Sequence, residues 1–282
     1  MKRRGSAGRV AKGGKRASGL LAFCIVLVLA CAQDKTQSQD ETAADAPPAL
    51  QGPQIVQDMV VAHGGIVAWR SAPTVSFEDE FNVPGQPAQV SRVVVEQARR
   101  RAYIDMTDGA KLAWDGEKAW SMGWQSPLPP RFLALLNYYF VNLPWLTQDP
   151  GVKLGEPGIG SLANDSTEYV TVMMTFEPGT GDTPDDYYRL YIDPATKRLK
   201  ACAYVVTYQS ILPGGLASSP EHVLVYDETA SVGGLLVPIR YTIYSNDAVY
   251  ASCVLRDWAF DKPFDVSRMT VPEEAVLDTS TP

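Results

Sequence analysis

The sequence predicts a mainly β protein: one strongly curved antiparallel sheet of about ten or eleven strands, with an N-terminal helix and a short helix that closes the concave face. Two observations support this fold class. Apolar and polar residues alternate along residues 74–83, which is typical of a strand with one buried and one solvated face, and similar segments recur as far as residue 258. A sheet of this size must curl or split, and its apolar side then needs a cover.

Residues 1–30 have the pattern of an export signal. Seven Lys or Arg and no acidic residue accompany the apolar run LLAFCIVLVLA at residues 20–30, which is shorter than the roughly 20 residues of a transmembrane helix. Cys31 follows directly, and this arrangement resembles bacterial lipoproteins, whose signal is removed before a lipid-modified cysteine. We therefore expect a lipoprotein signal peptide over 1–30 and membrane attachment through lipidated Cys31. A plainly cleaved signal and a retained anchor are the alternatives.

Residues 31–52 contain almost no large apolar side chain, so we expect a disordered acidic tether there. Because seven of the 25 basic residues and none of the 32 acidic ones lie in residues 1–30, the chain from Cys31 carries 18 basic against 32 acidic residues, a net charge of −14. This charge argues against nucleic acid as a partner.

Ala32 stands where an Asp retains many lipoproteins in the inner membrane, so we expect a lipid-anchored protein of the cell envelope, on the outer membrane and facing the periplasm.

A single β domain is expected over residues 53–276, followed by a flexible tail over 277–282. The domain starts with a helix, because Pro53 suits a first turn, apolar residues follow at helical spacing, and Gly64-Gly65 can end it. Short links between the later segments predict an antiparallel meander. The predicted strands are 74–83, 89–97, 101–106, 111–115, 118–122, 168–176, 187–192, 199–208, 221–227, 235–245 and 249–258.

One segment interrupts the strands, at residues 127–150. It opens with three prolines and contains a helix-like run, Arg131 to Phe140, that is apolar almost all round and must be buried on most sides. The run can be a plug that fills the open side of the sheet, or it can line a cavity for an acyl chain or another hydrophobic ligand; a plug that moves is a lid. The candidate ligand-binding residues are Phe132, Leu135, Leu136, Tyr139, Phe140 and Trp145.

Several motifs together carry a resemblance. They are Ala62-His63-Gly64-Gly65 followed by Trp69, then TVSFEDEF, WDGEKAW, YYFVNLPWLTQDPGV, GTGDTPDDYYRLYIDPATKRL and GGLLVPIRYTIY. In this order they resemble an uncharacterised family of bacterial envelope proteins, a domain of unknown function. That family is similar, more distantly, to the LolA and LolB lipoprotein carriers and receptors. The resemblance implies a half-barrel closed by helices over an apolar cavity, and no known reaction.

Catalytic patterns are sparse, and we predict no catalytic residue, no metal site and no cofactor. His63 lies near a helix C-terminus, where the helix dipole favours its charged form. We favour a packing or capping role for it, and it joins Trp69 as a candidate ligand contact. His222, at the start of a strand, is interpreted as a surface residue. Asp182, Asp185 and Asp186 are interpreted as a solvated turn rather than a calcium site.

Two features of composition complete the predictions. Cys202 and Cys253 fall on strands separated by two others, so we expect free buried thiols rather than a disulfide. The basic cluster Arg99-Arg100-Arg101 is interpreted as a solvated strand edge.

Three functions follow as hypotheses. The favoured one is a non-enzymatic, membrane-tethered binder of a lipid or other hydrophobic ligand. The second is a structural or protein-interaction module of the envelope whose concave face is filled by its own side chains, and a hydrolase is the third. An empty apolar cavity beneath residues 132–146 would favour the first hypothesis over the second.

Overall fold

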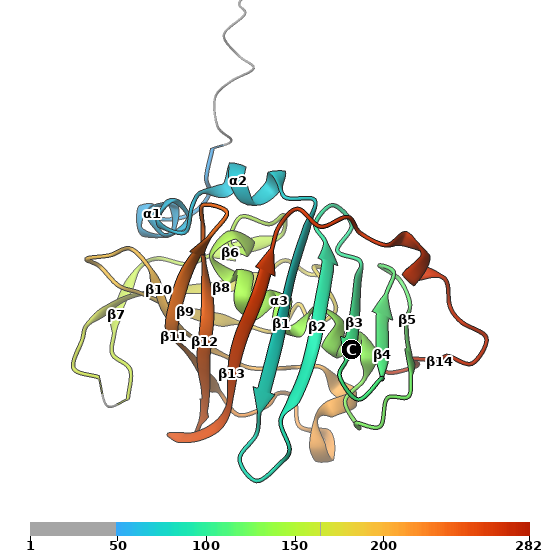
Figure 1. Cartoon of the computed structure of the whole chain (residues 1–282). Helices are drawn as coiled ribbons and strands as arrows, with labels where there is room; N and C mark the ends of the chain where they lie inside the picture. Colours follow the sequence, from blue (N-terminus) through green and yellow to red (C-terminus); the bar gives the residue numbers. More distant parts are fainter. Residues whose placement is uncertain (1–48, 164) are drawn as a thin grey trace, which may run out of the picture. The chain divides into compact units, whose positions relative to one another are not determined.

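The computed structural model describes residues 49–163 and 165–282. The expected signal peptide, Cys31 and nearly all of the tether lie outside the described residues. The described chain forms an antiparallel sheet of 14 strands that is strongly curved and does not close. Figure 1 shows helix α3 (Pro130–Leu146) running inside the curve of this sheet, with the shorter helices α1 (Gln54–Ala62) and α2 (Ile66–Ser71) at one end. The predicted fold class is therefore confirmed.

The sheet consists of two meanders that are joined through α3. The first contains β1 (Thr74–Asn82), β2 (Gln89–Glu96), β3 (Ala102–Met106), β4 (Lys111–Trp114) and β5 (Ala119–Met122). The second contains β8 (Tyr169–Phe176), β9 (Tyr188–Ile192), β10 (Leu199–Tyr204), β11 (His222–Val232), β12 (Leu235–Ser245) and β13 (Ala248–Ala259). All eleven predicted strands are present, with small differences at their ends.

Three short strands raise the count from the predicted eleven to 14. They are β6 (Val152–Leu154), β7 (Gly158–Gly160) and β14 (Val276–Leu277). Each has only two or three residues, which is too short for an alternation of apolar and polar side chains to be recognised. Strands β6 and β7 both pair with β8, and β14 pairs with β5. They form the two edges of the sheet.

Two strands far apart in sequence, β1 and β13, pair and so join the two meanders into one sheet. Strand β1 pairs with β13 from Ser76 opposite Ala259 to Asn82 opposite Ser252, and an irregularity between Ser76 and Glu78 adds to the bend. This pairing brings the first and last long strands together. Local patterns along the sequence do not reveal such a contact.

The predicted N-terminal helix is confirmed as α1. It ends where Gly64 adopts a φ of 102°, and a Cβ at this position would come within 2.4 Å of the Gly234 carbonyl oxygen. Only glycine satisfies both conditions. The chain then continues directly into α2, which the sequence does not predict and which carries Trp69.

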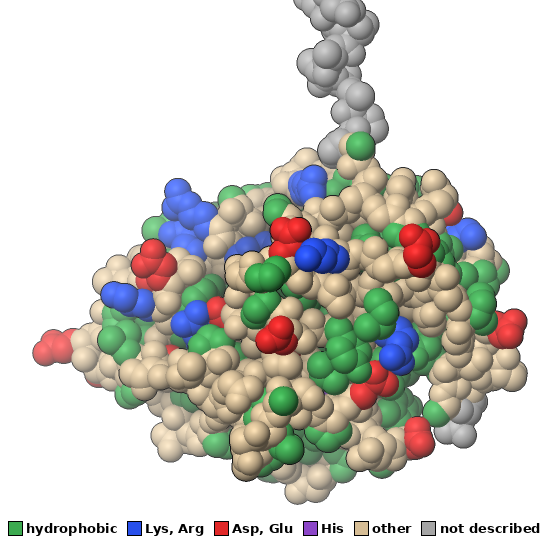
Figure 2. Space-filling model, turned by 180° about the vertical axis from the view of Figure 1, so that it is seen from behind, with side chains coloured by type: hydrophobic (Ala, Val, Ile, Leu, Met, Phe, Trp, Pro, Cys, Tyr) green, Lys and Arg blue, Asp and Glu red, His purple; other side chains and the backbone are tan. Residues whose placement is uncertain are grey.

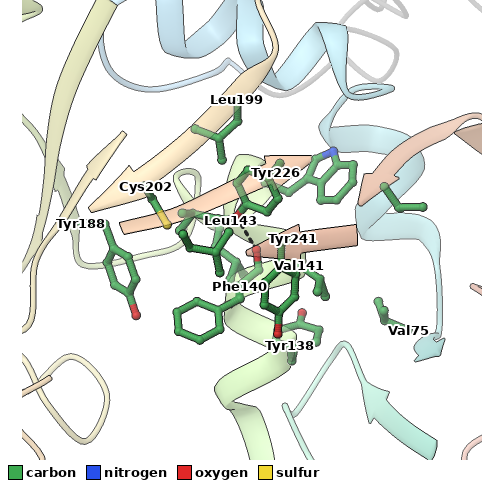
Figure 3. Packing of buried hydrophobic residues seen from close by; sticks show 14 of the residues in the cluster. Val75, Tyr138, Phe140, Val141, Leu143, Tyr188, Leu199, Cys202, Tyr226 and Tyr241 are labelled. Carbon is green, nitrogen blue, oxygen red and sulfur yellow. Dashed lines mark hydrogen bonds between the residues drawn. The ribbon is translucent and has the colours of Figure 1, made fainter. Parts of the chain in front are cut away.

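Helix α3 is longer than the predicted run and passes through Pro144. Proline has no N–H, so the carbonyl of Phe140 loses its usual helical donor at Pro144. The hydroxyl of Tyr226, on β11, donates to that carbonyl instead (Figure 3). The helix continues to Leu146 because a side chain from the sheet satisfies the acceptor that the proline leaves open.

The two halves of α3 differ in burial. Every residue from Phe140 to Gln148 is buried, and Phe140 and Leu143 pack among side chains of β9 to β12 (Figure 3). From Arg131 to Asn137 only Ala134 is buried. The second half therefore behaves as a plug, while the first half leaves space on either side of the helix.

The cysteine prediction is confirmed and the arginine interpretation is corrected. Cys202 and Cys253 are free and buried, on β10 and β13, with β11 and β12 between them.

Of the three arginines in the cluster Arg99-Arg100-Arg101, only Arg99 is exposed. Arg100 pairs with Asp149 at 2.7 Å, and Arg101 pairs with Glu96 at the same distance. These ion pairs leave the side chains of Arg100 and Arg101 only partly exposed.

The surface seen from behind carries no continuous basic area. Figure 2 shows basic and acidic side chains scattered over this face, with hydrophobic side chains in separate small groups. Within residues 49–163 and 165–282, no helix has the length and apolar character needed to cross a membrane.

Candidate functional site

A cavity of about 330 Å³ lies between the first half of α3 and the concave face of the sheet. Both meanders contribute to its wall, together with the segments before α3 and after β10. Most of its lining is apolar, as in small-molecule sites generally. Its main apolar lining residues are Phe81, Ile104, Met106, Leu112, Trp124, Leu128, Phe132, Leu133, Leu136, Phe140, Val206, Ile211, Leu212, Leu216 and Ile243. We call this space cavity 1.

One carboxylate lies in the wall of cavity 1. Asp79 belongs to the inward-facing row of β1, which also contains Val75, Phe77 and Phe81. Its side chain is only 2% exposed. Asp79 is also the residue that breaks the alternation of apolar and polar residues in this strand. An acid therefore stands where the strand pattern calls for a hydrophobic residue.

Neutral groups from three elements surround this carboxylate. The Ser91 hydroxyl, on the paired strand β2, donates to Oδ1 of Asp79, and the side-chain amide of Asn137, on α3, donates to Oδ2. The Tyr241 hydroxyl, on β12, donates to the other end of the Asn137 amide at 3.3 Å. This network connects the helix to both meanders across the floor of the cavity.

No basic group neutralises Asp79. In the described chain it has no ion pair, and no Lys or Arg lines cavity 1. Burial raises the pKa of Asp79 to about 6, although the hydrogen bonds from Ser91 and Asn137 oppose the shift. Burial also raises the pKa values of its neighbours Tyr241 and Cys253. Both neighbours are uncharged near neutral pH, so Asp79 is the titrating group on this side of the cavity.

Aromatic residues and one histidine line another part of cavity 1. The ring of His222 stacks on Tyr204 at 5.5 Å and meets Tyr250 edge-on at 5.1 Å. Nδ1 of His222 donates to the Pro220 carbonyl at 2.9 Å, and burial lowers its pKa. The interpretation of His222 as a plain surface residue is therefore incomplete: it begins β11 as expected, and its ring lines the cavity.

A second cavity of about 320 Å³ lies on another side of α3. Phe132 and Leu136 line both cavities, so this half of the helix separates them. The second cavity is more polar. Arg131 is paired there with Asp182 at 2.6 Å, and its guanidinium lies 5.0 Å from the Trp114 ring. Arg99, Arg100 and Asp186 also line it, so the second cavity contains charged groups of both signs.

The predicted ligand-binding residues separate into two groups. Phe132, Leu136 and Phe140 line cavity 1, and Leu135 and Tyr139 join Phe132 and Leu136 along the second cavity. The structure thus places five of the predicted residues, all between positions 132 and 140 of α3, in the lining of one or both cavities.

Trp145, Trp69 and His63 line neither cavity. Trp145 stacks on Trp69 at 5.9 Å and meets His63 edge-on at 6.1 Å, and all three are buried. His63 donates from Nδ1 to the Met59 carbonyl at 2.8 Å. Burial lowers its pKa to about 4, so the loss of solvation outweighs the helix end, which would favour the charged form, and His63 is neutral at physiological pH. The packing and capping role agrees with this geometry.

The acidic loop between β8 and β9 is engaged within the fold. Asp182 pairs with Arg131, and Asp186 accepts hydrogen bonds from the hydroxyls of Thr183 and Thr207. In the part of the chain that the structure describes, no three His, Cys, Asp or Glu side chains gather as a metal site would require. These carboxylates fix the loop to its surroundings.

The last residues, where the sequence predicts a flexible tail, make hydrogen bonds to the domain. Asp278 accepts from the backbone N–H of Arg131, at the start of α3, at 2.7 Å. The Tyr208 and Ser280 hydroxyls lie 2.6 Å apart. The chain end thus contacts the beginning of the helix that borders both cavities.

Asp79, Ser91, Asn137 and His222 line cavity 1 and are absent from the predicted site. A signal exists for the first of them, because an acid in the inward row of a strand needs an explanation. The other three carry no local signal. Only the pairing of β1 with β2 and the placement of α3 bring Ser91 and Asn137 to the carboxylate, and His222 lines the cavity from β11.

Comparisons with known proteins find similar folds at low sequence identity. A LolA superfamily protein from Nitrosomonas europaea is 10% identical, with a TM-score of 0.46, and the match covers 73% of this chain and 95% of that one. A DUF1329 family protein from Desulfovibrio piger is 8% identical, with a TM-score of 0.48, over 76% and 95%. MucB is 10% identical, with a TM-score of 0.30, over 79% and 65%. No family model and no curated protein matches the chain.

The likeness to LolA-type and unknown-function proteins that the sequence motifs suggest is thus found among solved structures. At these identities the likeness carries nothing about a ligand.

The raised pKa of Asp79 predicts a pH-dependent stability. Because its folded-state pKa of about 6 lies above the ordinary 3.8, ionisation disfavours the folded state as the pH rises through 6. Asp79→Asn removes this effect. Relative to the wild type, the free energy of unfolding of the variant should rise by about 2 kcal/mol from about pH 4 to about pH 8, measured by urea denaturation.

Glu117→Gln is the matched control, since it removes a negative charge at an exposed turn position. Its difference from the wild type should stay nearly constant over the same pH range. A constant difference for Asp79→Asn as well would contradict a buried carboxylate with a raised pKa.

Proposed function

We propose that this protein is a non-enzymatic binder of a hydrophobic ligand, which it holds in cavity 1. The supporting observation is an open space beside the first half of α3, lined mostly by apolar side chains and containing a few polar groups. Water in such a space gains few hydrogen bonds, so a hydrocarbon chain can replace it favourably. The volume of about 330 Å³ is near the lower end for ligand sites, which favours a single-chain ligand over a bulkier one.

We further propose that the protein works at the cell envelope, attached through a lipid on Cys31 and facing the periplasm from the outer membrane. The support lies in the sequence: a basic start, a short apolar run, and a cysteine directly after Ala30. The acidic stretch that follows would act as a flexible tether. A carrier or receptor of hydrophobic molecules needs to meet membranes without being buried in one.

A structural or protein-interaction module is the second candidate. The buried half of α3, from Phe140 to Leu146, favours it, because that half already fills its part of the concave face. The two candidates differ in what occupies cavity 1. A module with a self-filled face would take up no small molecule there.

The structure offers no support for a hydrolase. Within the described residues, the hydrogen bonds of both histidines go to backbone carbonyls, those of Met59 and Pro220, rather than to a carboxylate or a hydroxyl. A general base needs a partner that orients it and a nucleophile within reach.

Leu136→Trp tests the proposed ligand site. Leu136 is half-buried and lines both cavities, so a larger side chain should occupy the ligand space. The variant should bind the uncharged fluorescent probe N-phenyl-1-naphthylamine at least about tenfold more weakly than the wild type, while the melting temperature changes by a few degrees at most.

Val61→Trp is the control for adding an indole, because Val61 is 65% exposed on α1, far from the cavity lining. It should leave probe binding unchanged. A wild type that never binds the probe, together with an earlier melting Leu136→Trp, would retire the ligand-binding proposal in favour of the structural module.

Cys31→Ser tests the anchor. Two acyl chains hold a protein on a membrane stably, whereas one is marginal, so loss of the modified cysteine should move the protein from the membrane fraction to a soluble or unprocessed form. Fractionation followed by immunoblotting measures this. Normal cleavage with unchanged membrane partition would refute lipidation of Cys31.

A further inference from the structure

The chemistry of cavity 1 is asymmetric. Its interior combines an apolar wall with the single carboxylate of Asp79 and the imidazole of His222, whose pKa is lowered by burial, and within the described chain it contains no Lys or Arg that could hold an anion. A fatty-acid carboxylate or a phosphate drawn into the cavity would therefore meet another negative group and no compensating cation. At this depth, like charges repel more strongly than they do in water.

The fold holds the carboxylate of Asp79 as an oriented acceptor. The side chains of Ser91 and Asn137 donate to one oxygen each, and backbone groups of Ser91 and Asp79 also stabilise its charged form. The carboxylate is held in place from β2 and α3, so a ligand group that reached it would find its acceptor already oriented. Neither neighbour supplies a positive charge.

The position of Asp79 is costly for the fold itself. An unpaired acid in the inward row of β1 destabilises the folded state when it ionises, and a hydrophobic side chain would fit the strand pattern better. Violations of local rules of this kind concentrate at functional sites. Within the described residues, no Lys or Arg pairs with Asp79, so a stabilising ion pair does not explain why an acid stands here.

We propose that cavity 1 selects amphipathic ligands whose buried polar end donates hydrogen bonds to Asp79, as an ammonium or a hydroxyl group does, and rejects ligands with an anionic end. This inference rests on the proposed ligand-binding function and adds the class of ligand to it. The apolar wall formed by α3 and the sheet would receive the hydrocarbon part.

The test compares three amphiphiles with the same hydrocarbon chain: dodecylamine, dodecanol and dodecanoate. Their affinities are measured near neutral pH in about 0.15 M salt, by displacement of N-phenyl-1-naphthylamine from the full chain carrying Cys31→Ser. Dodecylamine should bind at least about tenfold more tightly than dodecanoate, because the ammonium pairs its positive charge with the carboxylate whereas dodecanoate is repelled by it. Dodecanol should lie in between, since its hydroxyl donates to the carboxylate without a charge of its own. In Asp79→Asn the preference for amine over carboxylate should fall to about threefold or less.

Glu117→Gln controls for the overall negative charge, since it removes one exposed acid and should leave the preference as in the wild type. Dodecanoate binding as tightly as dodecylamine, or a preference that survives Asp79→Asn, would overturn the inference while leaving the ligand-binding function standing. If the probe and all three amphiphiles fail to bind, the proposed function itself falls, and the inference falls with it.

Discussion

The concave face of the curved sheet has to be covered, and one helix does most of the covering. Helix α3 is apolar on nearly all sides because sheet surrounds it, and its second half packs so closely that every residue from Phe140 to Gln148 is buried. Where the helix passes Pro144, the Tyr226 hydroxyl satisfies the carbonyl of Phe140. A single helix is narrower than the curve of a 14-stranded sheet, so its less enclosed half leaves cavities beside it.

The hydrogen-bonded groups at Asp79 make one part of the lining of cavity 1 polar, while most of the rest is apolar. Hydrogen bonds of Ser91, Asn137 and Tyr241 connect the carboxylate to the helix and to both meanders. The same bonds therefore help to position α3 on the sheet. In the second cavity Arg131 pairs with Asp182, and Arg99, Arg100 and Asp186 also line the space. The two spaces beside one helix therefore differ in chemistry: cavity 1 has one uncompensated acid in a mostly apolar wall, and the second cavity has charged groups of both signs.

The sequence predicts much of the fold because strand alternation and helix spacing are local. All eleven strands with a readable pattern are found, whereas β6, β7 and β14 are too short to show one, and the pairing of β1 with β13 joins segments more than 150 residues apart. The candidate site is predicted less well. Apolar residues of α3 identify the right helix, but Trp145 and Trp69 are as apolar as Phe132 and lie in the closed core. Sequence alone cannot separate residues that line a space from residues that fill one, and Asp79 was visible only as a break in a pattern.

The central claim is that the first half of α3 leaves room for a hydrophobic guest. Native mass spectrometry of the full chain carrying Cys31→Ser, purified without detergent from cells that make it, tests this most directly. The account predicts that part of the population carries one small hydrophobic molecule per chain and that the adduct disappears when Leu136→Trp fills the space. A bare chain mass, with no adduct before or after incubation with hydrophobic molecules, would contradict the account and leave cavity 1 as an imperfection of packing.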